Sequence, residues 1–183
     1  YEYNQLQFVL LSDSLLVLAN RSSGLIGTSI YSIQTGDFTN LAPLHESTNE
    51  RSNLFSKDLR SIATLNDTLY YQSVNSDSID ILAFTLRSNA PALVKKLKWT
   101  YSKSIILANM TSVFVAHQSE NLYDTDIIRI NKTSKATTTL RTKLISSFFD
   151  EEASTKKITT NTGGLYYISQ TDSAGLYEFS NLG

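Results

Sequence analysis

Two pairs of aspartates are the residues whose type and spacing come closest to catalytic chemistry. Asp124 and Asp126 flank the start of an expected strand, and Asp77 and Asp80 occupy the corresponding loop of an earlier, similar segment. Two carboxylates at a suitable separation can hydrolyse a glycosidic bond. Aspartates at strand ends also serve simply as solvated residues, so we expect no catalytic role and retain Asp124 and Asp126 as candidate ligand contacts.

The other chemistry-bearing residues form no local site. His45 and His117 lie far apart in the sequence, so neither a His-x-x-x-His metal pair nor a catalytic triad can be assembled from neighbouring residues. The chain has no cysteine, and Gly24 and Gly27 fit a tight turn better than a phosphate-binding loop. We therefore predict a protein that is not an enzyme, with no catalytic residue, metal site or cofactor.

Charge is low and evenly spread along the chain. Charged residues make up 18% of the sequence and the net charge is −1, so no broad field attracts nucleic acid or an anionic membrane. The one basic cluster is Lys95, Lys96 and Lys98 beside Trp99. In a strand, Lys96 and Lys98 share one face while Lys95 and Leu97 share the other, which is typical of an outer strand whose charges prevent edge pairing.

Serine and threonine supply much of the polar character of this weakly charged chain. They total 45 residues, and such a polar, weakly charged surface is commoner outside the cytosol, which gives a weak lean to a secreted or cell-surface protein. No apolar run approaches 18 residues, so we expect no membrane span in this segment. The chain starts in strand-like sequence at Tyr1, and we expect it to be a processed or excised piece.

Asn-x-Ser/Thr sequons occur four times, a number close to chance. They begin at Asn20, Asn66, Asn109 and Asn131. All of them fall in expected turns, where a glycan could be carried without disturbing a core. Asparagine is also simply a good turn residue, so both interpretations stay open.

A unit of short apolar runs separated by polar turns recurs four times. The third copy reads Ser104-Ile-Ile-Leu-Ala108, a turn at Asn109-Met-Thr111, then Val113-Phe-Val115 and, after a loop, Asp126-Ile-Ile-Arg-Ile130. Runs of this length and composition, bounded by Asn, Asp, Ser, Thr or Gly, are typical of β-strands and hairpins. If Leu15, Leu69, Val113 and Leu165 are equivalent, the spacings are 54, 44 and 52 residues, the size of a four-stranded propeller blade.

These units resemble the blades of β-propellers, in the broad class that includes the kelch, WD-repeat and quinoprotein-like families. The resemblance covers most of the chain and is architectural, because no family-specific blade motif is present. It implies an all-β fold of about four blades, each of four antiparallel strands, forming a propeller or a portion of one. A β-sandwich is the alternative.

The predicted organisation is a single propeller-like domain or fragment over residues 1–183. Its units are approximately residues 7–44, 59–99, 103–142 and 156–183. The last unit has no fourth run, and residues 1–6 are a candidate for that outer strand, which would close a ring. The alternative, which we favour, is a larger ring with further blades outside this chain.

Two longer loops place apolar residues in polar sequence, Leu54 and Phe55 in one and Phe148 and Phe149 in the other. Such residues either pack back onto the fold or anchor a partner. We expect a non-enzymatic scaffold that presents these loops to a protein partner. The alternative is an extracellular carbohydrate- or ligand-binding module of a secreted or cell-surface glycoprotein.

Overall fold

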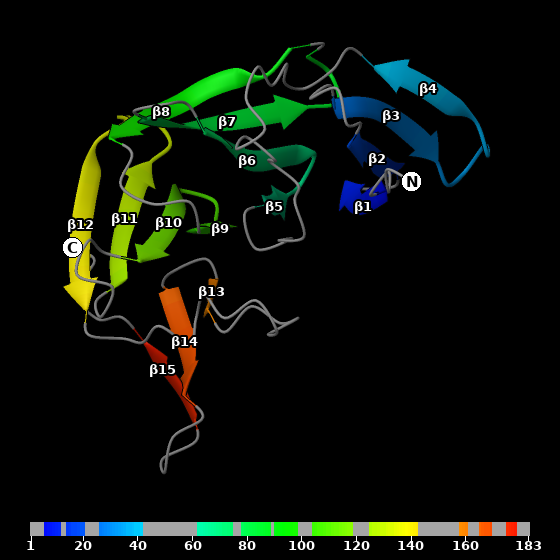
Figure 1. The fold of residues 1–183 in the computed structure, drawn as a ribbon. Coiled ribbons are helices and arrows are strands. Elements are labelled where there is room, and N and C mark those ends of the chain that lie inside the picture. Colours follow the sequence, from blue (N-terminus) through cyan, green and yellow to red (C-terminus); the bar gives the residue numbers. More distant parts are fainter. Residues whose placement is uncertain are drawn as a thin grey trace, which may run out of the picture. The chain divides into compact units, whose positions relative to one another are not determined.

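The described part of the protein consists of β-strands and turns, as seen in a computed structural model (Figure 1). The residues that the structure describes are 6–11, 14–20, 26–41, 62–74, 78–88, 90–98, 104–118, 125–142, 158–160, 165–169 and 175–178. Within them lie fifteen strands in four antiparallel sheets. The prediction of an all-β chain is confirmed.

Every sheet is a meander in which strands that follow each other in sequence pair side by side. The first sheet contains β1 (Leu6–Leu11), β2 (Ser14–Asn20), β3 (Ile26–Ser32) and β4 (Phe38–Leu41). The second contains β5 (Ile62–Leu65), β6 (Thr68–Val74), β7 (Ser78–Thr85) and β8 (Ala92–Lys98).

The third sheet contains β9 (Ser104–Ala108), β10 (Ser112–Gln118), β11 (Thr125–Asn131) and β12 (Thr137–Thr142). The fourth has three described strands, β13 (Ile158–Thr160), β14 (Leu165–Ser169) and β15 (Gly175–Glu178). Tyr1–Leu59 with Thr64–Trp99 form one compact unit, and Arg60–Ala63 with Thr100–Gly183 form another. The division into blades and the ring-closing role of residues 1–6 stay predictions.

The pairing register repeats from sheet to sheet. Leu15 lies opposite Tyr31, Leu69 opposite Phe84, and Val113 opposite Ile130. Each pair joins the second residue of the second strand to an apolar residue near the end of the third strand. A one-residue slip would exchange the two faces of the sheet. The repeated register therefore keeps equivalent residues on equivalent faces.

A turn of the same geometry joins the third and fourth strands of two sheets. In the first sheet, the N–H of Gly36 donates to the carbonyl of Ser32 at 2.8 Å, and the N–H of Ser32 donates to the carbonyl of Asp37 at 3.0 Å. In the third sheet, the N–H of Lys135 donates to the carbonyl of Asn131 at 3.0 Å, and the N–H of Asn131 donates to the carbonyl of Ala136 at 2.9 Å. Gly36 and Lys135 occupy the same left-handed position, with φ of 77° and 59°.

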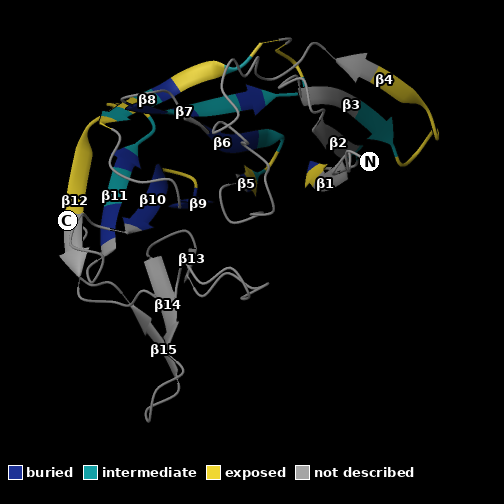
Figure 2. Ribbon diagram, in the orientation of Figure 1, coloured by how far each residue is buried: buried dark blue, intermediate teal, exposed yellow. Residues whose placement is uncertain are grey.

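Burial falls from the inner strands of a sheet to its last strand. In β10, successive residues from Val113 to Ala116 are all buried although they alternate between the two faces, so both faces are covered. In β12, Thr137, Thr138 and Thr139 are exposed. Figure 2 shows this gradient within the third sheet, from dark blue β10 to yellow β12.

The outer strand β8 carries a register shift that the sequence pattern does not reveal. Ile81 lies opposite Lys95 and Leu82 lies opposite Leu93, so Val94 is an extra residue and forms a β-bulge. The bulge reverses the alternation of faces, which buries Val94 and leaves Leu93 57% exposed. Beyond it, Lys96 and Lys98 are exposed as predicted. Lysines and a bulge both protect a sheet edge from pairing with another chain.

The turn geometry shared by the first and third sheets predicts opposite effects on stability for two substitutions. Replacing Lys135→Gly should stabilise the fold by about 1 kcal/mol, because glycine adopts a left-handed φ without the clash of a Cβ atom. Replacing Gly36→Lys should destabilise it by about the same amount. Urea denaturation of the two variants would measure both changes, and a destabilising Lys135→Gly would contradict the equivalence of the turns.

Candidate functional site

Four residues with functional side-chain groups lie in one row across the third sheet. Ser104 on β9 is opposite His117 on β10, His117 is opposite Asp126 on β11, and Asp126 is opposite Arg141 on β12. Directly opposite residues share a face, with Cβ atoms about 4.5–5.5 Å apart. The fold thus assembles a Ser, His and Asp series from positions that are far apart in sequence, although local spacing offers no triad.

Three residues of this row are buried, and this limits what they can do. Ser104 is 2% exposed, His117 9% and Asp126 8%. Each of the three is held by at least one further non-covalent contact. A catalytic serine must be reached by its substrate. The burial of Ser104 therefore favours a structural role for these three residues, because buried polar groups in proteins are normally hydrogen-bonded.

The second sheet has a related row at the equivalent position. Asp80 on β7 lies opposite Ser73 on β6 and opposite Lys96 on β8. Asp80 and Asp126 are equivalent when the two sheets are aligned on their register. In both sheets an aspartate on the third strand lies opposite a basic residue on the fourth in the backbone register.

The two candidate ligand contacts differ in what the structure shows of them. Asp126 belongs to the buried row, while Asp124 lies outside the described residues, as does Asp77 of the corresponding loop. Their role in ligand binding stays a prediction. Sequence reasoning missed Ser104 and His117 as neighbours of Asp126. Aligning the repeated units in the sequence and pairing their strands antiparallel would have revealed the row.

Asn109 closes the turn between β9 and β10 with its own side chain. Its Oδ1 accepts hydrogen bonds from the backbone N–H of Ser112 at 2.8 Å and of Thr111 at 3.1 Å, and from the Thr111 hydroxyl at 3.3 Å. The side chain is 6% exposed. This is an Asx-type turn, in which the amide oxygen replaces a backbone acceptor. The asparagine of this sequon is therefore part of the turn itself.

The other sequons lie at different levels of exposure. Asn131 is half-buried, and its Oδ1 accepts the N–H groups of Thr133 and Ser134, each at 2.9 Å. Asn66 is exposed and adopts a left-handed φ of 51°, and Asn20 is the last residue of β2. Glycosylation at the four sites stays a prediction.

Two turns of the third sheet are tied together at the opposite end from the polar row. The N–H of Lys132 donates to the carbonyl of Thr111 at 2.9 Å, and Nε of Arg129 donates to Oγ of Ser112 at 3.0 Å. Burial lowers the pKa of Lys132 to about 8, because a charged ammonium is poorly solvated there. Burial likewise raises the pKa of Tyr71 in the second sheet.

The predicted partner anchors lie elsewhere. Leu54, Phe55, Phe148 and Phe149 fall outside the described residues, so their role stays a prediction. In the part of the chain that the structure describes, no three His, Asp or Glu residues gather closely enough to hold a metal ion. The described ranges also contain no helix of the length and hydrophobicity needed to cross a membrane.

Comparison with known proteins gives a likeness of fold. No protein-family model and no curated protein matches the sequence. Among solved structures, TolB from Acinetobacter baumannii is similar, with a TM-score of 0.52 and 6% sequence identity. The match covers 91% of this chain and 37% of the TolB chain, so this chain spans little more than a third of TolB. This likeness and the antiparallel sheets fit a propeller-like fold.

The buried turn at Asn109 generates a stability prediction. Replacing Asn109→Ala removes an acceptor for two buried or part-buried N–H groups and should cost about 1–3 kcal/mol. Replacing Asn109→Asp keeps an oxygen at that position and should cost less. Urea denaturation would compare the two variants with the parent chain, and an alanine variant as stable as the parent would show that the turn does not depend on this side chain.

Proposed function

We propose that this chain is a portion of a β-propeller and acts as a non-enzymatic scaffold for protein–protein interaction. The observation that supports it best is the repetition of one four-stranded meander with one pairing register in three sheets. TolB, to which the fold is similar, contains a β-propeller. A repeated frame with a buried interior suits a protein that presents its loops and outer strands to a partner.

The outer strands support this role because their surface residues differ from sheet to sheet while the pairing register stays the same. The last strand of the second sheet carries lysines and a bulge, and that of the third carries exposed threonines. The first sheet ends in β4, where Phe38 is 67% exposed. Each sheet therefore offers a different surface on the same support.

A non-catalytic role agrees with the burial of the most reactive-looking residues. Ser104, His117 and Asp126 lie opposite one another in the third sheet and are all buried. Partner contacts are assigned instead to the long loops. Leu54 and Phe55 are the proposed anchors in the loop after the first sheet, and Phe148 and Phe149 in the loop after the third.

An affinity-capture experiment tests the scaffold. The parent chain and a variant with Leu54, Phe55, Phe148 and Phe149 all replaced by alanine would be crosslinked in cells and their partners quantified by mass spectrometry. Loss of hot-spot anchors of about 2 kcal/mol should reduce binding of the same partners by roughly 30-fold. Unchanged recovery of every partner would contradict the proposal.

The matched control replaces exposed apolar residues outside those loops. Leu93 and Met110 are 57% and 61% exposed, and a Leu93→Ala, Met110→Ala variant should retain the partners. If both variants lost the same partners, exposed apolar residues in general, and not the loops, would determine partner binding.

A further inference from the structure

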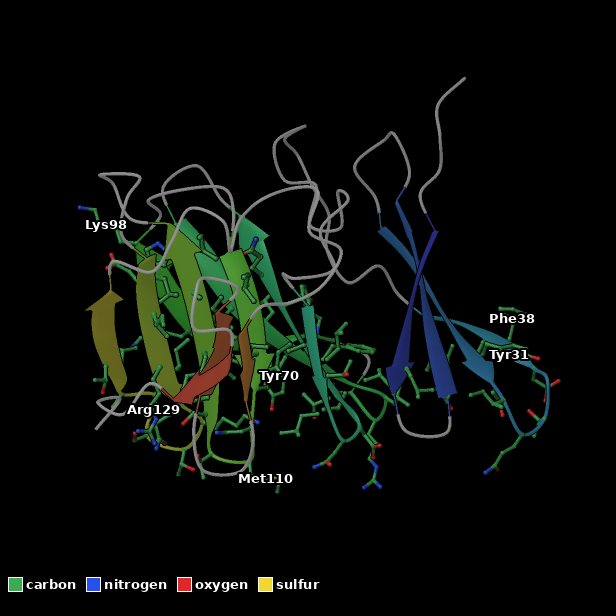
Figure 3. The ribbon with its side chains drawn as sticks, turned by 90° about the horizontal axis from the view of Figure 1, so that it is seen from below. Tyr31, Phe38, Tyr70, Lys98, Met110 and Arg129 are labelled. Atoms are coloured by element: carbon green, nitrogen blue, oxygen red, sulfur yellow. The ribbon has the colours of Figure 1, made fainter. Side chains whose placement is uncertain are left out.

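The last strands of the three four-stranded sheets differ in how well their outer edges are protected. β4 has only four residues. β8 carries Lys95, Lys96 and Lys98 together with the bulge at Val94, and Figure 3 shows the side chain of Lys98 pointing away from the strands. Short length, lysines and bulges each hinder pairing with another chain.

β12 has none of these protections. All six of its residues pair with β11 in an unbroken register, and Arg141 is its one charged residue. Thr137, Thr138 and Thr139 are exposed, and threonine favours the extended conformation of a strand. Among the residues that the structure describes, β12 pairs with β11 alone. The edge of β12 that faces away from β11, its outer edge, is therefore a template for one more strand.

The hydrogen-bond pattern identifies which backbone groups lie along that outer edge. The N–H of Asn131 donates to the carbonyl of Ala136 at 2.9 Å, so this facing pair is hydrogen-bonded. Hydrogen-bonded and non-hydrogen-bonded pairs alternate along antiparallel strands. Counting in the register from Ala136, the backbone N–H and C=O groups of Thr137, Thr139 and Arg141 point away from β11. The outer edge thus offers three donors and three acceptors to an incoming strand.

Positive charge lies at both ends of this edge. Lys135 directly precedes the strand residues, Arg141 lies near their other end, and Lys143 follows in the sequence. Residues 136–140 between them carry no charge. Among the described residues of the third sheet, Asp126 is the only acidic one. Opposite charges on neighbouring strands stabilise their pairing, so an incoming segment with acidic ends is favoured.

A second copy of this chain fits the edge less well. Two β12 strands would pair antiparallel about a twofold axis, with each residue making the same contact in both copies. If the axis passed by Thr139, Lys135 of each copy would lie near the end of the other copy that carries Arg141 and Lys143. Like charges placed opposite each other destabilise paired strands. The charges therefore favour a segment of a different protein.

We propose that the outer edge of β12 binds an extended segment of a protein partner, which joins the third sheet as an additional antiparallel strand. The segment has an uncharged centre opposite Thr139 and acidic residues at both ends. Main-chain hydrogen bonds to Thr137, Thr139 and Arg141 supply affinity, and the acidic ends supply selectivity.

This proposal rests on the scaffold role and names the chemistry of one partner. The capture experiment above alters only the two loops and leaves the edge of β12 intact. The two can therefore fail separately. Unchanged capture would remove the loop anchors, whereas absence of strand addition would remove the edge site.

Amide hydrogen exchange with a model peptide tests the edge. NMR would follow single amides of the 183-residue chain with and without the end-blocked peptide Glu-Thr-Val-Thr-Val-Thr-Glu. In the free chain, the amide of Thr138 should exchange slowly because it is bonded to β11, and those of Thr137 and Thr139 should exchange quickly. The peptide should slow exchange at Thr137, Thr139 and Arg141 by about tenfold or more and leave Thr138 unchanged. The same peptide with lysine in place of both glutamates should bind about tenfold more weakly.

A matched pair of variants separates backbone pairing from side-chain contact. Thr139→Pro removes one outward N–H and should weaken peptide binding by about tenfold or more, because proline is tolerated at an edge position but cannot donate to a new strand. Thr139→Val keeps that N–H and a branched side chain and should bind like the parent chain. Slow exchange at Thr138 verifies that each variant is folded. A peptide N-methylated at the amides that would face β12 removes the same hydrogen bonds without altering the protein.

Each contrary result overturns the proposal. No slowing of exchange at Thr137, Thr139 and Arg141 at about 1 mM peptide would mean that no strand is added. Equal binding of the lysine peptide would contradict the acidic partner. Binding that tolerates both Thr139→Pro and peptide N-methylation would place the peptide elsewhere. Slow exchange of Thr137 and Thr139 in the free chain would show an edge already covered, by a second copy if the protection disappears on dilution.

Discussion

The register between the second and third strands of each sheet is the constraint on which the rest of this structure depends. Antiparallel pairing fixes which residues share a face, and a shift of one residue would turn every apolar side chain toward the other side. The pairs Leu15–Tyr31, Leu69–Phe84 and Val113–Ile130 hold that register in successive sheets. The positions of these apolar pairs, of the polar row and of the turns all follow from it.

The turns keep the register by local means that do not require the same residues. Asn109 supplies an amide oxygen to the N–H groups that follow it, and Asn131 does so again at the turn between β11 and β12. At a turn of the same geometry in the first sheet, the hydroxyl of Ser32 accepts the N–H of Thr35. Different side chains thus perform the same task, which explains how the units keep one geometry with little sequence motif in common.

Many of the strands and turns are predictable from the sequence because each is determined by a short run of neighbouring residues. Apolar runs around Leu69 and Val113 and the turns at Asn66 and Asn109 mark the repeat, and each proves to be a strand or a turn. The bulge at Val94 is not predictable, because an extra residue in a strand is recognised only from its pairing with a neighbouring strand. Only the pairing with β7 shows that Leu93 and Val94 exchange faces.

The polar row escaped prediction for a different reason. Ser104, His117 and Asp126 are brought together by pairing between three strands, and no spacing along the chain encodes that neighbourhood. Their burial also changes the interpretation of Asp126, which looks like a solvated strand-end residue in the sequence and is 8% exposed in the fold. Chemistry-bearing residue types are thus informative about function only once their accessibility is known.

Paired cysteines test the repeated register most directly, and the chain has no cysteine to interfere. The pairs Ser73→Cys with Asp80→Cys and His117→Cys with Asp126→Cys occupy equivalent opposite positions in the second and third sheets. Opposite residues meet the Cα separation that a disulfide needs, about 4.4–6.8 Å, so both pairs should oxidise readily. The controls Ser73→Cys with Ile81→Cys and His117→Cys with Ile127→Cys place the thiols on opposite faces and should stay reduced. Equal oxidation of the controls, or oxidation of only one of the two opposite pairs, would contradict a register shared by the two sheets.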